Sequence, residues 1–234
     1  MRSLILLALF TWCVTAQSSS EPPTLIRLIR SDPRDARAQS PVTVLGMNSI
    51  TGLAETWLIE AHDSFGSIED VDKATGGPPL QSRTIVLLYQ PGLSYHPDQA
   101  VNNLPKARYF AASMYQIRPG TDLDFGELVK LRRAAFDSMN LDRPEIAYHA
   151  ISGAPSGTYI FLAPLQSLRS LDNGMAKTPT YAQAMTEAGA KAGRKIASEI
   201  ELSREQVLLR TEPRLSNVSE SFASADPEFW GLKR

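Results

Sequence analysis

Cysteine is almost absent from this 234-residue chain, and the single one, Cys13, lies close to the N-terminus. A basic residue precedes the apolar run Leu4–Phe10 there, and small residues follow at Val14–Ala16. This pattern is typical of a secretory signal peptide, so we expect residues 1–16 to be removed and the product to be secreted or periplasmic. Without Cys13, the mature chain has no disulfide, no thiolate metal ligand and no cysteine nucleophile.

The chain also lacks an excess of charge of either sign. It has 24 Lys and Arg against 25 Asp and Glu, a net charge of −1. Such a balance provides no long-range field for a polyanion, so we expect no nucleic-acid partner. Beyond the leader, no segment approaches the ~20 apolar residues needed to cross a bilayer, so we expect no membrane span.

Familiar catalytic and metal-binding motifs are missing. The three histidines, His62, His96 and His149, stand 34 and 53 residues apart, which does not match a metal-ligand spacing. Gly76-Gly77 is followed by two prolines rather than by a phosphate-binding Gly-Lys-Ser/Thr, and there is no Gly-x-Ser-x-Gly elbow. The sequence therefore predicts no metal site and shows no evident cofactor motif.

A pattern that occurs twice is the strongest feature of the chain. Residues 50–59 and 151–161 both run from an apolar residue, a hydroxyl and a glycine to Thr-aromatic-aliphatic. A second pair follows in the same order, with Val-Leu-Leu at 86–88 and again at 207–209. Matched landmarks in matched order indicate a duplicated unit.

Each copy has the element order of a small α+β unit. In the first copy we expect strands at 24–30, 42–50, 56–62 and 83–90, and a helix at 64–74 capped by Ser64 or Ser67. In the second we expect strands at 108–117, 145–152, 158–162 and 206–211, and helices after Thr121, at 167–173 and at 181–201. Thr121 and Asp124 form a capping-box pattern. In the tail, Phe222, Phe229 and Trp230 are expected to dock on the body.

The fold class follows from this order. A βαββαβ unit forms a four-stranded antiparallel sheet with its helices on one face, which is the ferredoxin-like arrangement. Two such sheets packed face to face would cover each other's apolar surfaces. The predicted organisation is a signal peptide (1–16), a first ferredoxin-like repeat (24–94), a linker (95–107), a second repeat (108–216) and a C-terminal tail (217–234).

In the second copy a strand ends at Ile117-Arg118-Pro119-Gly120. A capped helix, a hairpin and a strand–helix–strand segment are expected to follow it. In this order of elements the chain resembles the dimeric α/β-barrel superfamily. The resemblance covers residues 108–216 well and 24–94 less well, and the whole chain also resembles exported bacterial proteins. The superfamily includes antibiotic-biosynthesis-type monooxygenases, haem-degrading enzymes and chlorite-dismutase-like haem proteins. Membership implies a pocket between sheet and helices or between two sheets, but it does not imply one reaction.

Four residues are candidates for a ligand site. Asn48 and His149 occupy equivalent strand positions, and His149 would serve as a proton shuttle or axial metal ligand, or only as a hydrogen-bonded sheet residue. Trp57 and Tyr159 follow the matched threonines and would form a stacking wall for a flat ligand, or simply belong to the core. The haem-degrading branch uses an Asn, Trp and His set. Asn48 and Trp57 with His62 or His149 supply these residue types in a different order and spacing.

The other two histidines have weaker candidate roles. His62 shares strand parity with Glu60, so the two side chains are expected on the same face, as an acid–base pair or as a solvated sheet edge. His96 is expected at the surface.

Three functions remain open at this point. The first is an exported barrel protein that binds a small apolar or aromatic ligand between its sheets. The second is a cofactor-free monooxygenase or a haem-handling enzyme, and the third is a structural or interaction protein. The chain would be a monomer with an internal pseudo-dimer, or a homodimer.

Overall fold

The computed structural model describes residues 21–34, 40–141 and 143–231. The predicted signal peptide lies outside these residues. In the first half, β1 (Leu25–Ser31), β2 (Val44–Ser49), β3 (Thr56–His62), α1 (Phe65–Thr75) and β4 (Arg83–Tyr89) follow one another along the chain. The second half contains β5 (Tyr109–Ile117), α3 (Asp122–Ser138), β6 (Ile146–Ser152), β7 (Thr158–Leu165), α4 (Arg169–Ala176), α5 (Thr178–Ala184), α6 (Glu187–Lys195) and β8 (Glu201–Thr211).

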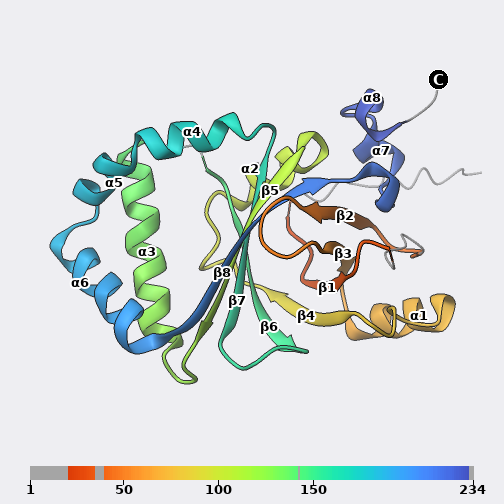
Figure 1. Cartoon of the computed structure of the whole chain (residues 1–234), viewed down its shortest axis with the longest axis horizontal. Helices are drawn as coiled ribbons and strands as arrows, with labels where there is room; N and C mark the ends of the chain where they lie inside the picture. The colour runs from red at the N-terminus through yellow and green to blue at the C-terminus, as the bar shows by residue number, and fades with distance from the viewer. Residues whose placement is uncertain (1–20, 35–39, 142, 232–234) are drawn as a thin grey trace, which may run out of the picture.

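The eight strands form one closed antiparallel barrel in the order β1-β3-β2-β8-β5-β7-β6-β4 (Figure 1). Each half contributes a ferredoxin-like sheet, ordered β4-β1-β3-β2 in the first and β8-β5-β7-β6 in the second. The sheets join at both edges, where β2 pairs with β8 and β4 pairs with β6. The predicted tandem ferredoxin-like fold is confirmed, and hydrogen bonds between the two sheets close it into a barrel.

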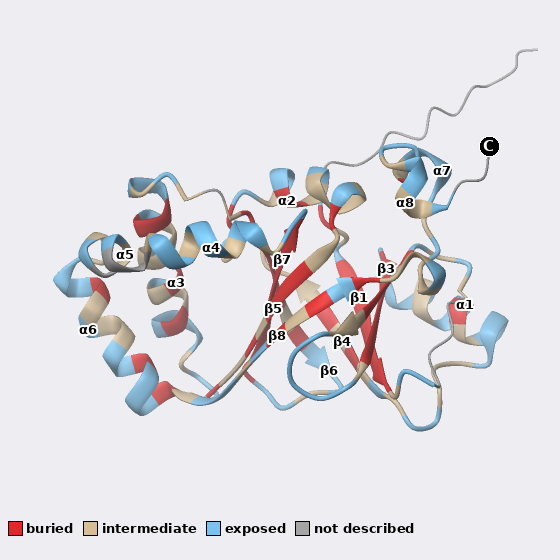
Figure 2. Ribbon diagram, turned by 45° about the horizontal axis from the view of Figure 1, so that its top comes forward, coloured by how far each residue is buried: buried red, intermediate tan, exposed pale blue. Residues whose placement is uncertain are grey.

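Side chains alternate along each strand and fill the barrel interior. The largest interior cluster takes every second residue of β1, β3, β5 and β7, including Leu28, Trp57, Phe110 and Ile160. Trp57 and Ile160 have no exposed surface. The strands are the most buried part of the molecule, whereas the outer sides of α4 and α6 face solvent (Figure 2). This interior holds the two halves together.

The two halves differ in their helical cover. Helices α3 to α6 lie on the outer face of the second sheet, and α1 is the helix beside the first (Figure 1). In the second half residues 118–145 connect the first two strands and contain α3, but the equivalent connection in the first half spans only residues 32–43. Such a segment is too short for a helix as long as α3, so the two halves differ in this connection.

The predicted helix over 181–201 is wrong because the chain breaks it twice. Helix α5 ends before Thr186, whose side chain accepts a hydrogen bond from the backbone N–H of Gly189 and so begins α6. A π-helical turn at Ile196–Ile200 then leads into β8, which begins at Glu201. Strand β8 is longer than predicted because it pairs with the whole of β5, as far as Ile117 opposite Glu201.

The capping-box prediction is also corrected. Thr121 does not form the predicted capping box, because its hydroxyl donates to the backbone carbonyl of Arg118 and no side-chain cap bond is made. The predicted linker contains α2 (Pro97–Asn103) and a 3₁₀ turn (Leu104–Lys106), each with a proline in its first turn. Proline is favoured there because the missing N–H would have had no helical partner. Ser64 caps α1, as predicted.

The C-terminal tail folds back onto the body as two short helices, α7 (Glu220–Ala223) and α8 (Pro227–Trp230). The indole Nε1 of Trp230 donates to the carbonyl of Pro105 over 2.8 Å. The Arg108 guanidinium lies 3.7 Å from the ring centroid of Phe229 and also pairs with Asp226. The predicted docking of the aromatic tail is confirmed.

Gly153 lies where the second hairpin meets β4, and we expect Gly153→Ala to destabilise the protein. Its φ is +80°, and an added Cβ would overlap the backbone carbonyl of Thr84. Gly120 is a matched control, because its φ is +84° but its Cβ would meet no atom of the described chain within 4 Å. Gly120→Ala should cost about 1–2 kcal/mol for the left-handed backbone, and Gly153→Ala about 1–3 kcal/mol more for the overlap. Equal losses in urea unfolding would contradict the predicted close contact.

Candidate functional site

Two adjoining cavities lie between the outer face of the second sheet and its helices. They have volumes of about 440 and 460 Å³ and share Tyr115, Arg132 and Tyr181 as lining residues. We call the pair the helix-side cavity. It lies on the side of the sheet that faces away from the barrel interior.

Strand parity and helix position bring the three shared residues together. Met114 of β5 points into the barrel, so the neighbouring Tyr115 points outward to the helices. Arg132 projects from α3 and Tyr181 from α5, and α3 packs against both α5 and α6. The residues come from three elements that only the folded chain brings together.

The apolar part of the cavity is rich in aromatic rings. The centroids of Tyr115 and Phe125 lie 5.5 Å apart, and those of Phe136 and Tyr181 lie 5.7 Å apart. Met185 adds a flexible thioether to the same wall. Rings and thioethers form favourable contacts with a flat aromatic molecule.

Arg132 is the central charged group. It forms an ion pair with Glu145, and the two side chains are only 18% and 7% exposed. Its guanidinium carbon also lies 4.9 Å from the ring centroid of Phe161. Its Nε atom is buried and has no hydrogen-bond partner in the described part of the chain, and the same is true of Nε of Arg143. Both nitrogens are closed off from solvent.

The lining carries more positive than negative charge. Arg132, Arg143, Lys177 and Arg204 contribute positive charge, whereas Glu145 and Glu201 contribute negative charge. Burial raises the pKa of Tyr181, so its phenol stays protonated at neutral pH and is able to donate a hydrogen bond. These features favour an anionic group on a ligand.

The structure places Trp57 and Tyr159 on opposite sides of the sheet wall, so the predicted stacking wall is wrong. Trp57 belongs to the barrel interior, whereas Tyr159 packs under α3 against Phe125 and donates a hydrogen bond to Asp122 over 2.6 Å. The turn after Ile151 has one residue more than the turn after Ile50. A shift of one residue reverses the face to which a strand side chain points.

Asn48 and His149 are not brought together with either aromatic residue as a single site. Asn48 accepts a hydrogen bond from the Thr56 hydroxyl over 2.6 Å, on the first sheet. His149 is half-buried on the second sheet and stacks on Tyr159 at a centroid distance of 4.5 Å. The four predicted ligand-binding residues are therefore spread over both sheets and both faces.

A haem with a histidine axial ligand does not fit the helix-side cavity. No histidine lines it, His149 is stacked on Tyr159, and His62 belongs to the other half. Burial raises the pKa of Tyr181, which disfavours a tyrosinate ligand.

Within the described residues, no three His, Asp or Glu side chains are grouped closely enough to hold a metal ion. The same residues include no helix of the length and apolarity that a bilayer crossing requires.

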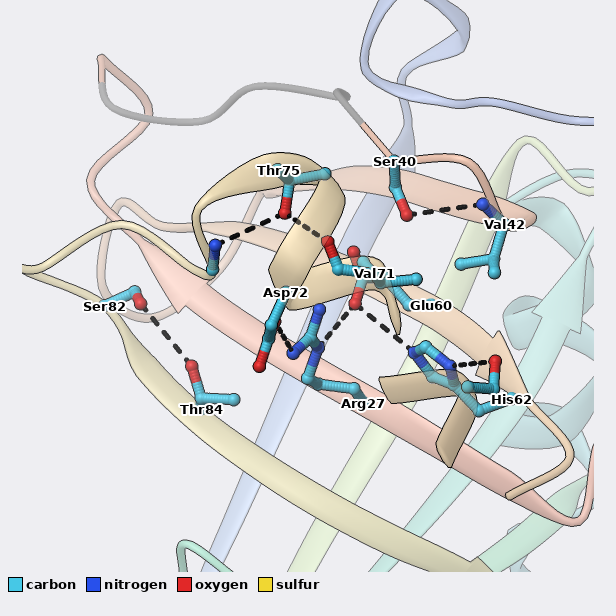
Figure 3. Close-up of polar contacts among 12 residues, drawn as sticks. Arg27, Ser40, Val42, Glu60, His62, Val71, Asp72, Thr75, Ser82 and Thr84 are labelled. Atoms are coloured by element: carbon cyan, nitrogen blue, oxygen red, sulfur yellow. Dashed lines mark hydrogen bonds and ion pairs between the residues drawn. The ribbon is translucent and has the colours of Figure 1, made fainter. Parts of the chain in front are cut away.

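His62 and Glu60 do project from the same face, as predicted (Figure 3). His62 Nε2 and Glu60 Oε2 lie 3.5 Å apart, and His62 Nδ1 lies 3.0 Å from the Ser67 hydroxyl. The pair is buried rather than part of a solvated edge. Burial lowers the pKa of His62, and this effect outweighs the opposing influence of the Glu60 carboxylate.

We expect this buried histidine to make stability depend on pH. Between the lowered folded-state pKa of His62 and its unfolded value of about 6.5, only the unfolded chain binds the proton. The free energy of unfolding should therefore be highest above pH ~6.5 and fall as the pH falls through this window. Urea unfolding of His62→Gln should show a flatter profile, whereas His96→Gln, at a side chain 46% exposed, should keep the original slope. An unchanged slope in His62→Gln would assign the effect to other groups.

Comparison with known proteins identifies the fold. No protein-family model matches the chain, and no curated protein is similar to it in sequence. A solved structure named "anthrone oxidase-like protein" matches with a TM-score of 0.52 and 11% identity over 82% of this chain and 93% of that one. A "putative monooxygenase" from Fusobacterium nucleatum matches with a TM-score of 0.50 and 7% identity over 80% and 91%. Chlorite dismutase from Candidatus Nitrospira defluvii has a TM-score of 0.47 at 12% identity over 86% and 96%. The chain has the dimeric α/β-barrel fold, with both halves in one polypeptide.

Proposed function

We propose that this protein binds a small, flat, anionic aromatic molecule in the helix-side cavity. The observation that carries the proposal is an aromatic lining on which basic side chains outnumber acidic ones, with Arg132 and Arg143 among them. Each guanidinium carries several N–H donors in a planar array that matches a carboxylate. The ligand position differs from the one predicted between the sheets, where Trp57 and its neighbours fill the space.

The remaining lining supports the same ligand. Tyr115, Phe125 and Tyr181 offer ring faces and edges for an aromatic body. The excess of basic residues favours a carboxylate or phenolate over a neutral or cationic group. Arginine is suited to this role because its planar guanidinium both stacks on rings and donates to anions.

A second candidate function is cofactor-free oxidation of such a molecule by dioxygen. The names of the two structures with the higher TM-scores favour it. With an anthrone as substrate, the ring CH₂ carbon would gain a carbonyl oxygen from O₂, and its two hydrogens would leave with the other oxygen as water. Arg132 and Arg143 would stabilise the enolate formed when the substrate loses its proton.

Binding is tested by calorimetric titration with 2-naphthoate and with neutral 2-naphthamide. We expect 2-naphthoate to bind and 2-naphthamide to bind at least tenfold more weakly, because only the anion satisfies the guanidinium donors. Arg143→Gln should weaken 2-naphthoate binding by about tenfold, whereas Arg169→Gln, an exposed change outside the cavity, should leave it unchanged. Equal affinity for the two ligands would overturn the anion assignment.

Oxidation is tested separately by oxygen uptake with anthrone. Oxygen uptake by the purified protein, and a lower rate of uptake by the Arg143→Gln variant, would support the enzymatic function. Binding of 2-naphthoate without oxygen uptake leaves a binding protein. If neither is observed, the structural or interaction role becomes the better interpretation.

A further inference from the structure

A second cavity lies in the first half, on the face of the first sheet that points away from the barrel interior. Its volume is about 500 Å³, and we call it the open-face cavity. The residues that line it come from β1, β3 and the segment between α1 and β4: Arg27, Ile29, Leu58, Glu60, Thr75, Gly77, Pro78, Pro79, Leu80 and Gln81. It shares no lining residue with the helix-side cavity.

Two buried charges form its floor. Arg27 on β1 and Glu60 on β3 are directly opposed in the strand register and only 3% and 6% exposed. Arg27 Nε donates to Glu60 Oε2 over 2.5 Å, and Nη1 donates to Asp72 of α1 (Figure 3). Strands β1 and β3 and helix α1 therefore each contribute one charged residue to this cluster.

One nitrogen and one oxygen of this pair are left without partners. The hydrogen bonds of Arg27 use Nε and Nη1, and those of Glu60 use Oε2, so within the described residues Nη2 and Oε1 have none. Neither atom is sealed from solvent. The floor therefore presents a cationic donor beside an anionic acceptor.

The walls are mainly apolar. Ile29 and Leu58 flank the ion pair on the sheet, and Pro78, Pro79 and Leu80 stand across from them. Prolines fix the backbone of this wall, which reduces the entropy lost when a ligand is enclosed. An apolar side chain would fit between the sheet and the proline segment.

We propose that the open-face cavity binds a small zwitterion, an α-amino acid with an apolar side chain. Its carboxylate accepts from Arg27 Nη2, its ammonium group donates to Glu60 Oε1, and its side chain packs against Pro78–Leu80. Both contacts are charge-assisted hydrogen bonds. They are strengthened by the low dielectric around the buried side chains of Arg27 and Glu60.

Molecules with a single charge fit less well. Arg27 faces two carboxylates, Glu60 and Asp72, so a lone anion is repelled by the surplus negative charge. A lone cation satisfies Glu60 Oε1 but leaves Arg27 Nη2 without an acceptor. A zwitterion satisfies both atoms and leaves the net charge of the cavity unchanged.

The test titrates the full chain with L-leucine, N-acetyl-L-leucine and L-leucinamide, using calorimetry. The second ligand lacks the ammonium charge and the third lacks the carboxylate. We expect L-leucine to bind and each blocked form to bind at least about tenfold more weakly. Equal binding of L-leucinamide would establish a cation site, and equal binding of N-acetyl-L-leucine an anion site. No binding of L-leucine at millimolar concentration would also overturn the proposal.

Variants locate the site. Glu60→Gln should reduce L-leucine affinity by about tenfold or more, whereas Glu69→Gln, an exposed change on α1, should have no effect. If Glu60→Gln does not fold, Gln81→Trp fills the rim without touching the buried ion pair and should also abolish binding. Retained binding in Gln81→Trp, or unchanged binding in a folded Glu60→Gln, would place the ligand elsewhere. These results are independent of 2-naphthoate binding, which depends on the other half.

Discussion

Replacing Trp57 with alanine should lower the free energy of unfolding by about 3–5 kcal/mol, the usual cost of removing a large buried aromatic side chain. Trp57 has no exposed surface and lies in the cluster that joins the two sheets. Its ring also lies 4.7 Å from the Arg30 guanidinium carbon, and its Nε1 donates to Glu55 over 3.1 Å. The substitution therefore removes packing, a cation–π contact and a hydrogen bond together.

Trp230→Ala is the control for this substitution. Trp230 is only partly buried and belongs to the docked tail, outside the barrel. Its loss should cost about 1–2 kcal/mol or less, mainly through the hydrogen bond to Pro105. Urea denaturation measures both variants. Equal losses would show that the barrel interior adapts to a cavity at Trp57.

Arg132→Leu should destabilise the protein by about 3–5 kcal/mol, because it leaves Glu145 as an uncompensated buried charge. Glu145 is 5% exposed, so water screens it poorly. Urea unfolding at neutral pH provides the measurement.

The partner substitution separates charge from packing. Adding Glu145→Gln to Arg132→Leu should recover part of the loss, because no unpaired carboxylate remains. Arg133→Leu, at the neighbouring position with a solvent-facing bond to Gly92, should change stability by about 0.5 kcal/mol or less. A double variant as unstable as Arg132→Leu would assign the effect to the lost contact between Arg132 and Phe161.

The fold was accessible from the sequence because its signals are local and repeated. Short runs rich in apolar and β-branched residues mark the strands, Ser64 and Gly76 mark the ends of α1, and the doubled hairpin pattern indicates two equivalent halves. These signals depend on neighbouring residues only. Closure of the barrel depends on pairing between β4 and β6 and between β2 and β8, which no local pattern records.

The candidate site was not accessible for the same reason. Arg132 and Tyr181 lie on helices that carry many polar residues, and nothing in their spacing distinguishes them from solvent-facing side chains. Their roles depend on burial beside Glu145 and Tyr115, which are distant in sequence. The helix predicted over 181–201 also concealed the break at Thr186, so α5 and α6 could not be placed over the cavity.

Covalent linkage of the two halves has a consequence for how this barrel can diversify. In a symmetric homodimer every substitution occurs twice, so both protomers must tolerate it. Here the connection between the first two strands spans residues 32–43 in one half and residues 118–145 in the other, so the two halves already differ within one chain. In a tandem chain, a substitution can therefore change the cavity of one half without changing the other half.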